Sequence, residues 1–263
     1  MKPKISIITI AYNSAVTIEQ TLQSVVAQSY DNKEYIVIDG ASTDETMSIV
    51  GRYADQIDVV VSEPDRGISD AFNKGIARAT GDIIVFINSD DYLLPDSLTQ
   101  VAAQYDGVHD IYCGNLLLLN PQTNYECRLT PSTTFPTMPF FRKAAHQGCF
   151  VTKSLYDRLG GYDTAIRYPM DLDFLMRAYR SGAKFKLMPV DVAVFRIGGV
   201  TSQDVRRKKK DYLYMVRHNG GNDLQAYTFY YFLLACQTTK RLLNCFGKDM
   251  LQKLRYRKTQ TPT

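Results

Sequence analysis

The first hundred residues alternate between short apolar stretches rich in β-branched residues and longer stretches with apolar residues at helical spacing. The strand-like stretches, typical of strands buried on both faces of a sheet, are residues 4–11, 35–38, 57–61 and 82–87. The helical stretches are residues 17–28, a helix opened by residues 42–45, residues 68–79 and a helix begun by Pro95. This alternation predicts an α/β fold with a doubly wound, mostly parallel sheet and flanking helices. Ligands of such sheets bind beyond the carboxyl ends of the strands.

The second half of the chain is less regular. Strands are expected over residues 111–119 and 185–195, and helices over residues 171–181 and 225–246, with a loop over residues 120–139. We expect one domain over residues 1–200 and a basic, helical C-terminal extension over residues 201–263.

Composition places the chain among globular proteins, since 45% of its 263 residues are hydrophobic and 22% are charged. No apolar run reaches the roughly 18 residues of a membrane-spanning helix, and the β-branched start differs from a signal peptide. The five cysteines lack the close spacing of metal ligands. We therefore expect free thiols and a cytoplasmic protein.

Charge is distributed unevenly along the chain. From residue 200 onward there are 13 Lys and Arg against 4 Asp and Glu, a net charge of +9, whereas the first 199 residues hold 18 against 23, a net charge of −5. Basic residues beside aromatic ones are typical of a helix on an anionic membrane surface, here the inner face of the membrane. The alternatives are a helical pair packed on the domain or on a second subunit, and a solubilising tail. Nucleic-acid binding is not expected, because no matching motif accompanies the charge.

Polar residues close the first two strands. Ala11, Tyr12 and Asn13 follow the first strand, and no glycine-rich loop of the dinucleotide or P-loop type accompanies them. A nucleotide bound there must be held by side chains, a metal ion and other backbone groups. Asp39 ends the second strand, where its carboxylate can accept hydrogen bonds from a base or a ribose hydroxyl. The alternative for Asp39 is capping of the next helix.

A charged cluster lies between the third strand and the third helix. Arg66, Asp70 and Lys74 fall on or near successive turns, and the guanidinium of Arg66 can pair with a diphosphate. Charges at this spacing also form ordinary solvated helix faces, which is the alternative here.

The fourth strand ends in Ser89, Asp90 and Asp91. Two adjacent carboxylates repel one another unless a cation or hydrogen-bond donors separate them. Mg²⁺ and Mn²⁺ are commonly shared between one or two carboxylates and the phosphates of a substrate. The pair therefore predicts a divalent metal site at this edge of the sheet, and an acidic turn before a helix is the alternative.

Four blocks of sequence together resemble the family 2 glycosyltransferases of GT-A fold. The blocks, in family order, are residues 6–13, 38–44, 63–67 and 88–91, and the resemblance extends over residues 4–200. It implies inverting transfer of a sugar from a nucleotide diphosphate donor, with UDP as the default, to a glycan or lipid-linked acceptor in polysaccharide or glycoconjugate biosynthesis. It also implies Mn²⁺ or Mg²⁺ as the cofactor.

The clusters and the resemblance together define a set of expected donor-site residues. The nucleotide-sugar-binding residues are Ala11, Tyr12, Asn13, Asp39, Arg66, Asp70, Lys74, Ser89 and Asp90. By the resemblance, Asp91 is favoured as the direct metal ligand, and Asp90 faces ribose or metal-bound water.

The resemblance also implies residues on the acceptor side. Family members place the general base in a Glu-Asp pair that opens a later helix; here Met170 replaces the Glu, and Asp171 remains as the base. Asp173 is the alternative base. His146 and Gln147 resemble an acceptor-side His-Gln pair, and a structural histidine is the alternative.

Arg196, Gly198 and Gly199 follow the last predicted strand. We expect a loop that closes over the diphosphate, with the two glycines as hinges. A plain turn is the alternative.

Two rival functions come from other classes. A sugar-phosphate nucleotidyltransferase shares the layered sheet and an acidic metal site, but it requires a glycine-rich, basic loop after the first strand, which residues 12–15 do not provide. A non-catalytic nucleotide-sugar or glycan-binding module would have a degenerate site, and the joint retention of Asp39, Asp90, Asp91 and Asp171 argues against it. The donor sugar, the acceptor hydroxyl and the oligomeric state stay open.

Overall fold

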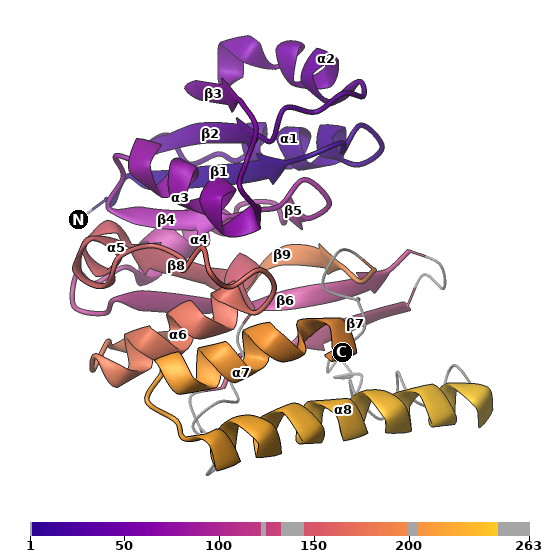
Figure 1. Ribbon diagram of the computed structural model, residues 1–263. Helices are drawn as coiled ribbons and strands as arrows, with labels where there is room; N and C mark the ends of the chain where they lie inside the picture. Colours follow the sequence, from indigo (N-terminus) through magenta and orange to yellow (C-terminus); the bar gives the residue numbers. More distant parts are fainter. Residues whose placement is uncertain (1, 122–124, 133–144, 199–204, 247–263) are drawn as a thin grey trace, which may run out of the picture.

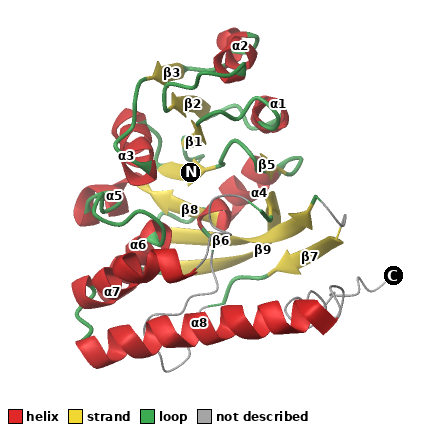
Figure 2. Cartoon of the chain, turned by 45° about the vertical axis from the view of Figure 1, so that its right-hand side comes forward, coloured by secondary structure: helices red, strands yellow, loops and turns green. Residues whose placement is uncertain are grey.

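The computed structural model describes residues 2–121, 125–132, 145–198 and 205–246. Within these ranges nine strands form one twisted sheet with helices on both faces (Figures 1 and 2). The strands are β1 (Ile5–Ala11), β2 (Lys33–Asp39), β3 (Val59–Ser62), β4 (Ile83–Phe86), β5 (Tyr92–Leu93), β6 (Ile111–Asn120), β7 (Tyr125–Leu129), β8 (Cys149–Thr152) and β9 (Phe185–Arg196). The α-helices are α1 (Ile18–Val26), α2 (Thr46–Gly51), α3 (Ile68–Arg78), α4 (Ser97–Gln104), α5 (Lys153–Leu159), α6 (Met170–Arg180), α7 (Lys209–His218) and α8 (Asp223–Phe246). Short 3₁₀-helices are η1 (Ala54–Gln56), η2 (His146–Gly148) and η4 (Val205–Lys208).

The sheet has two halves of different topology. Its order is β3-β2-β1-β4-β8-β6-β9-β5, with β7 paired to β6. Strands β1 to β4 pair in parallel, as the alternating pattern predicts. Beyond β4 the sheet is mixed, because β8 runs antiparallel to both β4 and β6 while β6 pairs in parallel with β9. The carboxyl ends of the parallel strands therefore share one edge of the sheet.

Each face of the sheet has its own hydrophobic core, and β1 contributes to both. Ile5 and Ile7 pack with Leu22 of α1 in one core, whereas Ile8 packs with Phe72 of α3 in the other. Successive side chains of a strand point to opposite faces. Burial on both faces is why most residues of β1 and all residues of β4 are apolar.

The C-terminal helices belong to the second of these cores. Leu213 and Val216 of α7 and Phe229 of α8 are buried in the cluster that contains Phe174 of α6, and α7 lies between α6 and α8 (Figure 1). Of the alternatives weighed for this extension, packing on the domain is therefore present in the structure. Within the described ranges, no helix combines the length and the apolar character that a membrane span requires.

At the amino-terminal edge of the sheet, the buried carboxylate of Glu34 connects β2 to the segments that lead into β1 and β4. Glu34 of β2 accepts hydrogen bonds from Thr80 N at 2.6 Å and Thr80 Oγ1 at 2.6 Å, and Lys4 Nζ lies 2.8 Å away. Burial opposes its ionisation, but the hydrogen bonds from Lys4, Ser6 and Thr80 outweigh burial and lower the pKa of Glu34 from 4.5 to about 2. The ionised form is therefore favoured by folding.

We expect Glu34→Gln to destabilise the protein in a pH-dependent way. Because the pKa of Glu34 is lower in the folded state than in the unfolded state, its ionised carboxylate adds to the free energy of unfolding. This contribution is complete above pH ~4.5 and is lost as the pH falls through about 2. The pKa shift corresponds to about 3 kcal/mol. Urea unfolding should show that loss near pH 7, reduced by roughly half at pH 3. The exposed Glu19→Gln is the control. An equal loss at both pH values would contradict the assignment.

Candidate active site

The loops after β1 and β2 are held against each other at the carboxyl edge of the sheet. Asn13 N donates to Ser42 Oγ at 2.8 Å, and Thr43 N donates to Asn13 Oδ1 at 2.9 Å. Asn13 and Ala41 both have left-handed backbone, with φ of 48° and 60°. Asn tolerates this conformation through its short polar side chain, whereas Ala is strained in it. Backbone strain is thus concentrated where the sequence predicts nucleotide binding.

Asp39 is fully buried at the end of β2. Its carboxylate accepts from Ser42 Oγ at 2.5 Å, Ser42 N at 2.9 Å and Ser62 Oγ at 2.7 Å. Because α2 begins only at Thr46, the helix expected from residues 42–45 is shorter, and Asp39 organises the intervening turn instead of capping a helix.

The loop after β3 approaches these two loops closely at Gly40. A Cβ atom at Gly40 would lie 2.8 Å from Asp65 Oδ2 and 3.2 Å from Tyr12 Cδ2, so a larger residue there would displace these two side chains. Tyr12 itself is 65% exposed. The edge of the sheet therefore presents an accessible aromatic ring between two tightly apposed loops.

The charged cluster at the start of α3 is largely paired with itself. Lys74 Nζ lies 2.7 Å from Asp65 Oδ1 and 3.1 Å from Glu63 Oε1. Arg66 pairs with Asp70 Oδ1 at 3.1 Å, but its side chain is 87% exposed. Hydrogen bonds from the backbone and side chain of Arg66 hold the pKa of Asp70 below its usual value. Lys74 thus shapes the loop, and Arg66 is the cation of this cluster with freedom to turn.

Asp91 connects four parts of the chain. Its fully buried carboxylate accepts from Arg196 N at 3.0 Å and from Gln147 Nε2 at 3.1 Å, and its carbonyl oxygen accepts from Thr21 Oγ1 at 2.6 Å. The expectation that Asp91 is the direct metal ligand stays a prediction; in the structure its carboxylate makes these two hydrogen bonds. Both carboxylate oxygens of Asp91 are engaged in holding β9 and η2 to the end of β4. Gln147, expected on the acceptor side, is likewise buried in this contact.

Asp90 and its neighbours are the less committed groups at this edge. Asp90 is only partly buried, and Ser89 Oγ lies 2.7 Å from Ser14 Oγ. Burial raises the pKa of Asp90 above its usual value; burial and the charge of Asp90 also raise the pKa of Asp91. Among the described residues, the buried Oδ1 of Asn88 finds no hydrogen-bond partner.

These groups fit a hard divalent cation that is completed by a ligand. The described residues contain no group of three or more His, Cys, Asp and Glu able to hold a metal ion. They do offer the Asp90 carboxylate and the unpartnered Asn88 oxygen, and oxygen donors suit Mg²⁺ and Mn²⁺. A cation would also offset the charge repulsion between Asp90 and Asp91.

Arg196 is the last residue of β9 rather than part of a loop. Its guanidinium donates through one nitrogen to Asp90 O at 2.8 Å and through another to Gln20 Oε1, and it lies 5.2 Å from the centre of the Tyr92 ring. The expected closing loop therefore starts after Arg196. Gly198 has a φ of 136°, which favours glycine, and Gly199 lies outside the described residues.

His146 joins the end of β4 to the start of α6. Its Nδ1 lies 3.4 Å from Asp171 Oδ2, and its Nε2 lies 3.3 Å from Asn88 Nδ2. Because the Asn88 amide donates to Nε2, Nδ1 carries the proton that His146 donates to Asp171. Burial opposes ionisation of Asp171, but its interaction with His146 and a backbone hydrogen bond from Leu172 outweigh burial and lower the pKa of Asp171. The Asp171 side chain is still 33% exposed.

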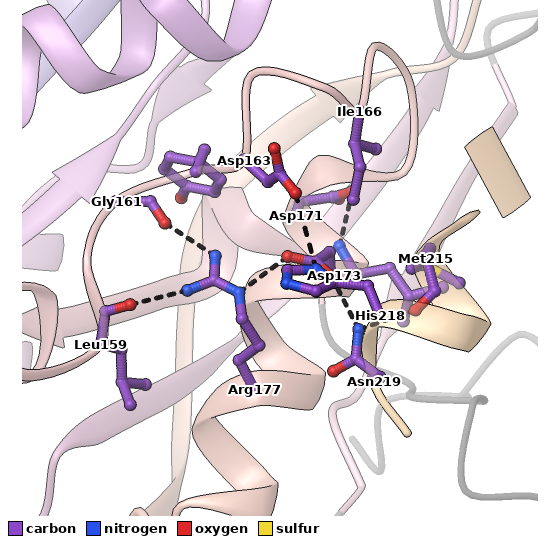
Figure 3. Close-up of polar contacts among 12 residues, drawn as sticks. Leu159, Gly161, Asp163, Ile166, Asp171, Asp173, Arg177, Met215, His218 and Asn219 are labelled. Carbon is purple, nitrogen blue, oxygen red and sulfur yellow. Dashed lines mark hydrogen bonds and ion pairs between the residues drawn. The ribbon is translucent and has the colours of Figure 1, made fainter. Parts of the chain in front are cut away.

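Asp173 has a different environment from Asp171, although both lie in the first turn of α6. It is fully buried and accepts from Arg177 Nε at 2.8 Å and Asn219 Nδ2 at 2.7 Å (Figure 3). Arg177 in turn donates to the carbonyl oxygens of Leu159 and Gly161. The structure thus places Asp173 in a buried network between α6 and the end of α7, and its role as the alternative base stays a prediction.

Sequence reasoning missed three side chains that this geometry brings in. Ser62 and Ser42 hold Asp39, and Asn88 holds His146. Ser42 and Asn88 lie inside the recognised blocks, so their position was available as a signal. Ser62 offered none, because its role depends on the pairing of β2 with β3.

The family model of glycosyl transferase family 2 matches residues 6–158. A PGL/p-HBAD biosynthesis glycosyltransferase of Mycobacterium bovis is 30% identical over 215 residues, which are 78% of this chain and 82% of the relative. The chain therefore belongs to glycosyl transferase family 2, and it is a glycosyltransferase.

Solved structures of other proteins have the same fold. The fragment 1–349 of S. aureus TarS, in complex with UDP-GlcNAc, matches with a TM-score of 0.65 and 19% identity over 81% of this chain and 66% of that one. The match spans 39% of the longer TarS chain. The mannosyltransferase PcManGT from Pyrobaculum calidifontis, in complex with GDP-Man and Mn²⁺, matches with a TM-score of 0.65 and 20% identity over 94% of this chain and 76% of that one. The GT-A-type α/β fold is thereby confirmed.

The two adjacent aspartates should differ in their effect on stability. Asp91→Asn would point an amide N–H at one of two buried donors, which should cost about 1–3 kcal/mol of unfolding free energy. Asp90→Asn removes a repelled charge and should change the free energy by no more than about 0.5 kcal/mol. Urea unfolding without added metal measures both. Equal losses in the two variants would contradict the structural role of Asp91.

Proposed function

We propose that this family 2 glycosyltransferase is a metal-dependent, inverting enzyme. It moves a hexosyl or N-acetylhexosaminyl group from a nucleotide diphosphate donor to a glycan or lipid-linked acceptor in polysaccharide or glycoconjugate biosynthesis. The observation that carries the proposal is the connection from Asn88, beside Asp90, through His146 to Asp171. The imidazole of His146 contacts the proposed donor side through one ring nitrogen and the proposed base through the other.

The donor nucleotide is proposed to bind at the carboxyl ends of β1 and β2. The exposed Tyr12 ring offers a stacking surface for a base. Ala11, Asn13 and Asp39 lie at the same strand ends, where Asn13 and Asp39 are both hydrogen-bonded to Ser42. Arg66, with its exposed guanidinium, is proposed to turn toward the diphosphate. UDP is the default nucleotide; TarS with UDP-GlcNAc and PcManGT with GDP-Man are the similar proteins that support this donor class.

The metal is proposed to be Mn²⁺ or Mg²⁺, held by Asp90 with the oxygen of Asn88. When bound, it would act as a Lewis acid for the negative charge that builds on the departing diphosphate. Asp91 is assigned the task of fixing this turn. The Mn²⁺ complex of PcManGT supports the choice of ion.

Asp171 is proposed to be the general base. A carboxylate whose pKa is lowered stays ionised at neutral pH, so it can accept the proton of the attacking sugar hydroxyl. His146 donates to Oδ2 and orients the carboxylate, and the 33% exposure of the side chain leaves room for an acceptor. Direct displacement with such a base inverts the anomeric carbon.

The rival functions explain less of this geometry. Neither a nucleotidyltransferase nor a binding module requires a general base at the start of α6, so neither function accounts for a carboxylate there that is oriented by a histidine. We further propose that residues 1–200 form the catalytic domain and residues 201–263 an extension, whose helices α7 and α8 pack on that domain.

Asp171→Asn should abolish transfer while leaving donor binding intact. The amide cannot accept the proton, so release of nucleoside diphosphate from UDP-GlcNAc, UDP-glucose or GDP-mannose with Mn²⁺ and a membrane extract should fall by roughly 10²–10⁴-fold. The control is Asp157→Asn, in an exposed ion pair with Lys153. Retained turnover in Asp171→Asn would contradict the assignment of Asp171 as the general base.

We also propose that α8 contacts the anionic inner face of the membrane, which would give a cytoplasmic protein a peripheral position. Leu224, Tyr231 and Phe232 are large apolar side chains exposed on α8. The Nζ atom of Lys209 on α7 lies 5.6 Å from the centre of the Tyr227 ring on α8. Aromatic side chains beside a strongly basic segment fit anionic headgroups in both charge and polarity.

Replacing Tyr231 and Phe232 together by Ser should weaken sedimentation with phosphatidylglycerol vesicles at least tenfold, since each buried ring contributes about 1.5 kcal/mol or more. Neutral phosphatidylcholine vesicles should bind poorly in every case. Tyr179→Ser, which alters an exposed ring on α6, is the matched control. Unchanged binding of the double variant would contradict the proposed surface.

A further inference from the structure

One face of α7 runs along the loop that leads into α6. Asp211, Tyr214, His218 and Asn219 have the spacing i, i+3, i+7 and i+8, which places them on one side of a helix. All four make polar contacts with residues 160–173. The contacts therefore extend over the whole length of α7.

The first of these contacts lies directly before the proposed base. Asp211 Oδ2 accepts from Arg167 N at 3.0 Å and from Tyr168 N at 3.1 Å. Lys208 Nζ lies 5.0 Å from the centre of the Tyr168 ring. Tyr168 is three residues before Asp171. Asp211 of α7 therefore binds the backbone just before α6, the helix that contains Asp171.

The N-cap residue of α6 is Pro169, which makes no side-chain capping hydrogen bond. Within the first turn, Leu172 N donates to Asp171 Oδ1 at 2.8 Å. Negative charge is favoured near a helix N-terminus. The carboxylate of Asp211 brings such a charge from the neighbouring helix, because it accepts from the two backbone amides that directly precede Pro169.

The other end of the same face fixes α6 from the buried side. Tyr214 Oη donates to Asp163 Oδ2 at 3.1 Å, and Asn219 Nδ2 donates to Asp173 Oδ1 at 2.7 Å. His218 Nδ1 lies 3.5 Å from Asp163 and 3.6 Å from Asp173 (Figure 3). The start of α6 is thus held at two points, on either side of Asp171.

We propose that α7 is the positioning element for the proposed base Asp171, and that Asp211 is its principal positioning residue. The inference rests on the proposed function, because it takes the role of Asp171 from there. It assigns part of the active site to the extension after residue 200, beyond the family match at residues 6–158. The extension then contributes to the rate of transfer as well as to the core.

Asp211→Ala should lower kcat about 10–100-fold, because small displacements of a catalytic group have effects of that size. The readout is UDP release from UDP-GlcNAc and UDP-glucose with Mn²⁺, and KM for the donor should stay within twofold. Asp211→Asn keeps an acceptor oxygen and should lie between wild type and Asp211→Ala. It carries the test if the alanine variant does not fold.

Asp223→Ala is the matched control, since it removes an exposed carboxylate of α8 that pairs with Arg217 of α7, and it should leave kcat unchanged. A normal kcat in Asp211→Ala together with an inactive Asp171→Asn would overturn the positioning role alone. Turnover in Asp171→Asn would instead overturn the base assignment. If Asp223→Ala lost as much kcat as Asp211→Ala, the loss would be due to reduced stability of the whole protein. That result would also overturn the proposal.

Discussion

The arrangement of the candidate site depends on the buried carboxylate of Asp91. It accepts a backbone hydrogen bond from Arg196 and a side-chain hydrogen bond from Gln147, so the end of β9 and η2 are both fixed to the turn after β4. With Asp91 directed inward, Asp90 and Asn88 are the oxygen donors left for a ligand. A charge buried in this way costs folding energy unless it is fully hydrogen-bonded. The energy is recovered through the joining of segments that are distant in sequence.

A second carboxylate, Asp173, has the corresponding role in the C-terminal half. Its ion pair with Arg177 and its hydrogen bond from Asn219 tie α6 to α7. Asp171, two residues earlier in the same turn, stays accessible and meets His146. In both halves one acidic residue of a close pair is buried as a structural tie, and its neighbour is free for chemistry.

Much of the fold could be predicted from local sequence. β-branched apolar runs such as that of β1 are stable only as buried strands, and the alternation with helices predicts their parallel pairing. The mixed half could not be derived in this way, because the antiparallel placement of β8 depends on contacts between distant segments. The different environments of Asp90 and Asp91 could not be predicted for the same reason, because Arg196, which donates to the Asp91 carboxylate, lies 105 residues away in the sequence. Adjacent residues of identical type can be distinguished only by what surrounds them.

The central claim is that Asp90 and its neighbours form a metal-dependent nucleotide site. The most direct measurement is the melting temperature with UDP, GDP, CDP or dTDP, each with and without Mn²⁺, for the wild type and for Asp90→Asn. A ligand at about 100 times its Kd stabilises the folded state by roughly 2.7 kcal/mol. We predict a rise of several degrees with one nucleotide, present only with Mn²⁺ and lost in Asp90→Asn. A metal-dependent rise that persists in Asp90→Asn, or no such rise with any nucleotide, would contradict the account.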